Sequence, residues 1–153
     1  MLFNAREVFN YNGKEYILTP PNLATEDQFA DYLGSYAIRE VTRKQKSFGQ
    51  AFETALTIVY RDVASGYYSW FGEGWAKAIN SDLHFKELVR LILMQEPGNA
   101  LLPQQIHDAW LQDSGEKKPD GSILTIGEKM VQAIWGFINR KNSPSPAPTN
   151  QPG

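Results

Sequence analysis

Apolar residues recur every three or four positions through most of this sequence, a spacing that places them on one face of successive α-helices. The clearest apolar stripe runs from Phe48 to Val63, and Ser65-Gly66 directly after it is a typical helix end. Further stripes of the same kind lie within residues 29–41, 83–94 and 130–138. The chain is therefore expected to be mainly helical.

A β-hairpin is expected before the first helix. Two β-prone runs, at about residues 6–11 and 14–19, are joined by Asn12-Gly13, a pair that favours a two-residue type I′ turn. This turn sets Phe9 opposite Tyr16. Because an isolated two-stranded hairpin is marginally stable, we expect it to pack on helices or to add to another chain's sheet. Phe9 and Tyr16 are the candidate self-association edge.

Capping signals predict where the first and last helices begin. Thr25 with Gln28 forms one capping box, and Thr125 with Glu128 forms another. Between the last two helical patterns, residues 114–122 are rich in Gly, Ser, Lys and Asp, so we expect a loop there.

These patterns predict one domain of the mainly α (α+β) class over residues 1–141. It comprises the hairpin at 6–19 and a bundle of about five helices within 25–141. Residues 142–153 are rich in proline, and we expect them to form a disordered tail.

Composition excludes several classes of function. The 15 Lys and Arg residues nearly balance the 17 Asp and Glu residues, so no overall positive field attracts nucleic acid or anionic membranes. The chain has no cysteine, which excludes disulfides and thiolate-bound metals. It has no apolar run long enough to span a bilayer. Its first residues are too polar for a signal peptide, so we expect none. We expect a cytoplasmic protein that binds no membrane, no nucleic acid and no cofactor.

The two histidines offer little for catalysis or metal binding. His84 lies three residues before Glu87, which supplies two ligands where a metal site needs three or four. His107 and Asp108 are neighbours in the sequence, so they point to different faces of a helix. They are therefore poorly placed to act together as a catalytic base and the carboxylate that orients it. We therefore expect no enzymatic activity and no metal site.

Four basic residues cluster after the first helical stripe: Arg39, Arg43, Lys44 and Lys46. Such a cluster could contact phosphates. The simpler interpretation is that cations complement the negative end of the helix dipole and keep a loop solvated.

An aromatic segment separates the second and third helical patterns. Its candidate partner-binding residues are Tyr67, Tyr68, Trp70, Phe71 and Trp75. Rings on a connection between two helices usually fill the gap between them, which is the simpler interpretation. Rings on a connection broken by glycines, as here, can instead point outward, and aromatic residues are enriched at the centres of protein interfaces.

The layout resembles the tail assembly chaperones of long-tailed bacteriophages. Residues Asn12 to Pro21 are similar to the family's opening, in which a glycine-lysine turn leads into a strand and then proline. Residues 85–94 and 102–110 are similar to its hydrophobic helix and the short acidic helix that follows. The resemblance implies a non-enzymatic helper that binds the tape measure protein, keeps it soluble and helps recruit tail tube subunits. Such a protein could also form homo-oligomers.

Two other functions fit the same sequence. The chain could be a structural adaptor retained in the phage particle, with the hairpin and the tail as docking arms. It could also be a small hydrolase or a nucleic-acid-linked regulator that uses the basic cluster and His107-Asp108.

Overall fold

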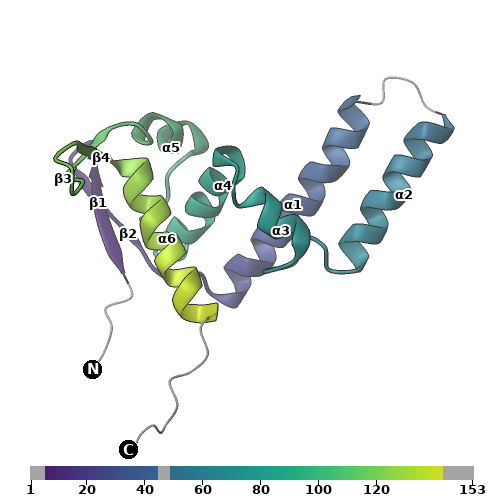
Figure 1. Ribbon diagram of the computed structural model, residues 1–153, viewed down its shortest axis with the longest axis horizontal. Coiled ribbons are helices and arrows are strands. Elements are labelled where there is room, and N and C mark those ends of the chain that lie inside the picture. Colours follow the sequence, from purple (N-terminus) through teal and green to yellow (C-terminus); the bar gives the residue numbers. More distant parts are fainter. Residues whose placement is uncertain (1–5, 45–48, 143–153) are drawn as a thin grey trace, which may run out of the picture. The chain divides into compact units, whose positions relative to one another are not determined.

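The computed structural model describes residues 6–44 and 49–142, and no side chain after Asn139. Ten helices and strands follow one another in these residues (Figure 1): β1 (Glu7–Tyr11), β2 (Lys14–Leu18), α1 (Leu23–Lys44), α2 (Gln50–Ala64), α3 (Glu73–Ala78), α4 (Asp82–Leu93), α5 (Pro103–Ala109), β3 (Asp113–Lys117), β4 (Ile123–Thr125) and α6 (Ile126–Asn142). The mainly α class with an N-terminal hairpin is confirmed. The predicted disordered tail, apart from its first residue Asn142, lies outside the described residues.

The chain groups into two compact units. One comprises residues 1–20 and 108–153, and the other comprises residues 21–107. That the two make a single domain over 1–141 stays a prediction.

The first unit contains the predicted hairpin in the predicted register. Asn12 and Gly13 both have positive φ, as a type I′ turn requires, and Phe9 pairs with Tyr16. The two rings stack with centroids 5.5 Å apart, and they are only 2% and 7% exposed. They are core side chains here. Self-association through the hairpin stays a prediction, and it would have to use the strand edges rather than these rings.

The loop predicted for residues 114–122 is confirmed for residues 118–122, but it is wrong for residues 114–117, which belong to β3 and pair with β4 in a second antiparallel hairpin. Its register shifts between Asp113 and Glu116, and Gly115 has a φ of 89°. Most side chains of β3 are polar and exposed, so no alternation of apolar and polar residues marks the strand in the sequence.

The last helix begins as predicted. Thr125 Oγ1 accepts the backbone N–H of Glu128 at 3.1 Å, and the Glu128 carboxylate accepts the backbone N–H of Thr125 at 3.0 Å. Helix α6 contacts β2, β3 and β4. Its buried face, which includes Met130, Ile134 and Phe137, supplies much of the core of this unit.

The second unit is built around α1, which contacts α2, α3 and α4. Helix α1 begins two residues before the predicted cap, because the side chain of Asn22 accepts the backbone N–H of Thr25 at 2.8 Å. Thr25 lies inside the first turn and is buried.

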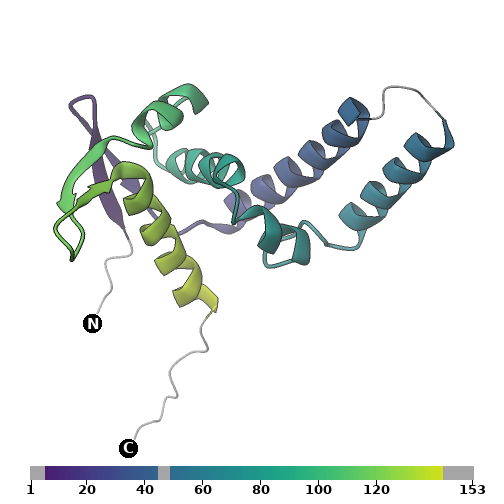
Figure 2. The ribbon, with the colours of Figure 1, turned by 45° about the horizontal axis from the view of Figure 1, so that its top comes forward.

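Helices α1 and α2 run antiparallel and lie side by side in both ribbon views (Figures 1 and 2). The two helices pack closely at Gly34, where an added Cβ would lie 3.1 Å from a methyl group of Val63. Helix α2 ends at Ala64, followed by Gly66 with positive φ, as predicted. We call this pair of helices the arm.

Candidate protein-binding surface

The five rings of the aromatic connector, the segment that follows α2, have three different environments: Trp70 and Trp75 pack against each other, Tyr67 and Tyr68 line a groove, and Phe71 is exposed. Trp75 is 5% exposed and packs against Trp70, with ring centroids 5.1 Å apart. Trp70 meets Phe29 of α1 edge-on at 6.2 Å. For these two rings, the structure supports the simpler interpretation that they fill the gap between helices. Their role in partner binding stays a prediction.

Two close approaches fold the connector back on itself. An added Cβ at Gly72 would lie within 2.8 Å of three backbone carbonyl oxygens, those of Gly66, Tyr67 and Ser69. At Gly74, an added Cβ would lie 2.5 Å from the ring of Tyr67. The two glycines therefore allow bulky rings to pack at close range.

Tyr67 and Tyr68 line an open groove of about 500 Å³ in the second unit. The other walls come from α1, α2, α3 and α4, and their main residues are Leu33, Tyr36, Ala37, Glu40, Val59, Lys77, Ala78 and His84. We call it the aromatic groove. Most of its walls are apolar or aromatic, and its charged groups are Glu40 and Lys77.

Both charged side chains of the groove, Lys77 and Glu40, interact with neighbouring side chains. Lys77 Nζ donates to the Tyr67 hydroxyl at 3.1 Å, which is the main reason that the pKa of Lys77 is raised. Glu40 pairs with Arg43 at 2.7 Å, and this hydrogen bond lowers the pKa of Glu40. Burial raises the pKa of Tyr68, so its hydroxyl stays neutral at physiological pH. Such a surface suits an apolar partner with a few polar groups.

His84 is a groove residue that sequence reasoning missed. Its Nδ1 lies 2.8 Å from the Tyr32 hydroxyl, and its ring meets Tyr36 edge-on at 4.5 Å. The one signal in the sequence was the spacing of Tyr32 and Tyr36, which lie one helical turn apart and so share a face of α1. No local pattern indicates that His84 contacts that face. Burial lowers the pKa of His84. The negative charge of Glu40 raises it, but this effect is smaller.

We expect the protein to lose stability on acidification through His84. Its pKa lies below the usual 6.5 in the folded state, so the unfolded chain binds the proton more readily. The stability linked to this group is complete above about pH 6.5 and is lost as the pH falls through the lowered pKa. Urea unfolding measures the free energy of unfolding at pH 7.5 and at pH 5.5. Between these pH values, this free energy should decrease less for His84→Gln than for the wild type. His107→Gln, at an exposed histidine, should keep the wild-type decrease. Equal decreases in all three would contradict this assignment.

Phe71 is the exposed ring of the connector. It is 43% exposed and has a φ of 67°, a left-handed conformation that is strained for a bulky residue. Its ring rests edge-on against Trp75 at 5.0 Å. Of the five candidate residues, Phe71 is therefore the one whose side chain is most available to a partner.

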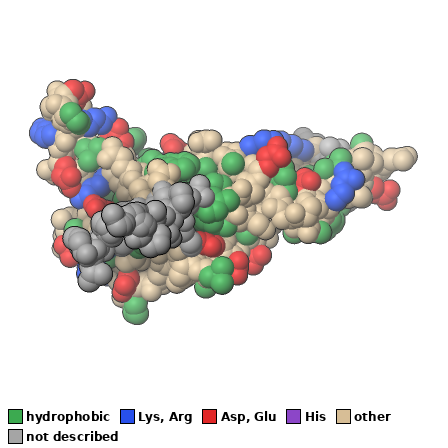
Figure 3. Space-filling model, turned by 60° about the horizontal axis from the view of Figure 1, so that its bottom comes forward, with side chains coloured by type: hydrophobic (Ala, Val, Ile, Leu, Met, Phe, Trp, Pro, Cys, Tyr) green, Lys and Arg blue, Asp and Glu red, His purple; other side chains and the backbone are tan. Residues whose placement is uncertain are grey.

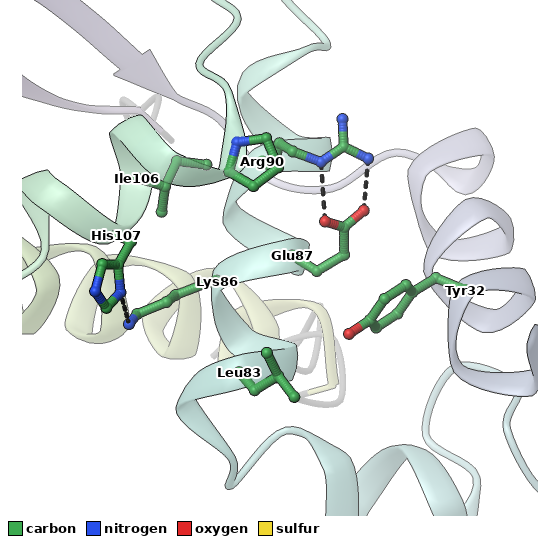
Figure 4. Close-up of a pocket in the computed structure, with 8 residues that line it drawn as sticks. Tyr32, Leu83, Lys86, Glu87, Arg90, Ile106 and His107 are labelled. Atoms are coloured by element: carbon green, nitrogen blue, oxygen red, sulfur yellow. Dashed lines mark hydrogen bonds and ion pairs between the residues drawn. The ribbon is translucent and has the colours of Figure 1, made fainter. Parts of the chain in front are cut away.

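A second pocket, of about 360 Å³, lies among α1, α4 and α5 (Figure 4). Arg90 holds the Glu87 carboxylate by two hydrogen bonds, of 2.9 and 2.5 Å. Burial, followed by the charge of Glu87, raises the pKa of Tyr32 to about 12. The remaining walls include the apolar side chains of Leu83 and Ile106. This pocket could take an apolar side chain.

The residues considered from the sequence as metal ligands or catalytic groups have other contacts in the structure. Glu87 bonds to Arg90 rather than facing a metal beside His84, and His107 Nδ1 lies 3.2 Å from Lys86 Nζ. Within residues 6–44 and 49–142, no three His, Cys, Asp or Glu side chains are grouped as a metal site would need.

The described residues of the basic cluster, Arg39, Arg43 and Lys44, are exposed near the end of α1. Glu40 pairs with Arg43 and lies 3.9 Å from Lys44, while Lys46 lies outside the described residues. These contacts fit the interpretation of a solvated helix end.

No helix among the described residues combines the length and the apolar character that crossing a membrane requires. Comparisons with models of known protein families, with curated proteins and with solved structures found no match.

Proposed function

We propose that the chain is a tail assembly chaperone of a long-tailed bacteriophage. In this role it binds the tape measure protein in the host cytoplasm, keeps it soluble and helps recruit tail tube subunits. The similarity of residues 12–21, 85–94 and 102–110 to that family suggests the partner. The observation that carries the proposal is the aromatic groove, an open and largely apolar surface lined by Tyr67 and Tyr68 of the connector.

The groove suits one face of an amphipathic helix. Helix-in-groove recognition needs a mainly apolar trough into which side chains spaced three or four residues apart can insert. Tyr36, Tyr67 and Tyr68 offer rigid rings for such contacts, and Lys77 and Glu40 supply charges that can favour one direction of the bound helix. A long helical protein with apolar stripes has many segments of this kind.

A matched pair of substitutions on α3 tests the proposal. Ala78 lines the aromatic groove, whereas Ala76, two residues earlier on the same helix, is exposed and is not among the residues that line it. We expect Ala78→Glu to weaken binding of the partner about tenfold or more, because it places a carboxylate against an apolar stripe. Ala76→Glu should bind as the wild type does.

The measurement is co-expression with a tape measure protein of a long-tailed bacteriophage, the partner class that the proposal names, followed by co-purification of the complex. The wild type and Ala76→Glu should keep the partner soluble and co-purify with it, and Ala78→Glu should do neither. If the wild type fails to co-purify, the chaperone function is wrong. If Ala78→Glu binds as well as the wild type, the groove is not the binding surface.

A further inference from the structure

The outer half of the arm carries apolar side chains that the arm itself does not bury. None of residues 35–44 of α1 or 50–58 of α2 is fully buried, although they include Ile38, Leu56 and Ile58. Ile58 is 43% exposed. Figure 3 shows hydrophobic side chains mixed with acidic and basic ones on one face of the arm, at the right of the view. Two antiparallel helices cover only one stripe of each other, and bundles of four cover the rest.

A row of exposed side chains on α1 has a self-complementary charge pattern. Its members lie one every four residues and are Asp27, Asp31, Ser35, Arg39 and Arg43. Side chains at this spacing form a continuous ridge on a helix. The order along the helix is acid, acid, serine, base, base. If a second copy of the helix lies antiparallel to the first, with the two Ser35 residues facing each other, each acid therefore faces a base. Asp27, Asp31 and Arg39 form no ion pair with any described residue.

The helix dipole explains only part of this pattern. It favours acids in the first turn and bases in the last turn, and its effect is small beyond them. Asp31 and Arg39 lie more than one turn inside a helix of 22 residues. Their positions are equally far from Ser35. Arg39 lies over the ring of Tyr36, 5.9 Å from its centroid, but neither Asp31 nor Arg39 has an ion-pair partner among the described residues.

A hollow of about 430 Å³ lies beside the ridge, between α1 and α2. Ala30, Gly34, Ile38 and Val63 form much of its lining, and Asp31 lies at the same hollow. The hollow is open at the surface of the unit, so it can accept a side chain from outside.

We propose that two copies of the chain associate through α1, antiparallel, about a twofold axis at Ser35. In this dimer Asp31 lies opposite Arg39 of the second copy, and Asp27 lies opposite Arg43. Ile38 of each copy enters the hollow beside Gly34 of the other. Ridges of this spacing interdigitate when helices cross at about 50°, and a twofold interface requires a patch complementary to itself. The aromatic groove uses other residues of α1, so this dimer does not depend on the proposed function.

Charge reversals test the dimer. Asp31→Arg sets two arginines against each other at both ends of the interface, and Arg39→Asp sets two aspartates against each other. Either change should weaken the dimer about tenfold or more. The double variant Asp31→Arg/Arg39→Asp should restore it. A mixture of the two single variants should also restore it, as a heterodimer, because each then supplies the charge that the other needs.

The measurement is light scattering after size exclusion, where the monomer has a mass of 17.3 kDa and the dimer twice that. The control is Glu96→Arg, the same change of charge at an exposed residue outside α1, which should dimerise as the wild type does. Circular dichroism checks that each variant is folded. In the wild type, added salt should weaken the dimer, since exposed ion pairs are screened.

Three results would overturn the proposal. The wild type could remain a monomer at about millimolar concentration, or both single reversals could dimerise like the wild type. The mixture of folded single variants could also stay monomeric. If a single variant fails to fold, two other results still test the dimer. The double variant should dimerise, and added salt should weaken the wild-type dimer; failure of both would overturn the proposal.

Discussion

Trp75→Ala is expected to destabilise the folded protein by about 3–5 kcal/mol, because it removes a buried indole from a packed aromatic cluster. Trp75 is 5% exposed, and its ring packs against Trp70 and Phe71, with centroids 5.1 and 5.0 Å away. The neighbouring rings are held by the connector and cannot close the cavity fully. Urea unfolding followed by circular dichroism measures the loss.

Two control substitutions separate packing from other effects. Trp75→Phe keeps an aromatic ring and removes an indole N–H that no described residue accepts, so its cost should be about 1–2 kcal/mol. Phe71→Ala, at the exposed ring, should cost about 1 kcal/mol. A loss below about 1 kcal/mol for Trp75→Ala would contradict its placement in the core.

Gly72→Ala is expected to cost about 3 kcal/mol or more, through a steric clash rather than backbone strain. The φ of Gly72 is −70°, which alanine adopts without strain. Its Cβ, however, would lie 2.6 Å from the carbonyl oxygens of Gly66 and Tyr67. Backbone atoms cannot move aside as a side chain can, so the turn would have to open. The hydrogen bond from Gly72 N to Ser69 O would then be lost.

Gly49→Ala is the matched control for this substitution. Gly49 also precedes a helix, its backbone is extended, and an added Cβ would meet no atom of the described residues within 4 Å. It should cost less than about 1 kcal/mol. For a chain of this size, thermal melting should separate the variants by about 5–10 °C. Equal melting temperatures would show that the connector tolerates a side chain at residue 72.

Local signals predicted the parts of the fold in which neighbouring residues decide the conformation. The register of β1 and β2 follows from Asn12-Gly13, and the start of α6 follows from the capping pair of Thr125 and Glu128. The start of α1 was misplaced because Asn22 and Thr25 are both good caps, and the choice between them depends on the burial of Thr25. The β3–β4 hairpin was missed because its exposed polar strand has no apolar alternation.

The candidate site was predicted only as a segment. The five aromatic residues were recognised from their clustering, but the sequence could not separate buried rings from accessible ones. That division depends on Phe29, which meets Trp70 from a distant part of the chain, and on Tyr36 and His84, which complete the groove. No short-range pattern links these residues.

The sequence by itself determined the mainly helical class, the first hairpin and its register, because turn chemistry and helical periodicity act over a few residues. Only the tertiary structure decided which apolar side chains are covered. Burial depends on contacts between residues far apart in the chain. These contacts bury Trp75, but they leave Phe71 exposed and bury none of residues 35–44 and 50–58 of the arm fully. The apolar stripes thus have two uses: they predict the helices, and the parts of them that stay exposed indicate where a partner protein can bind.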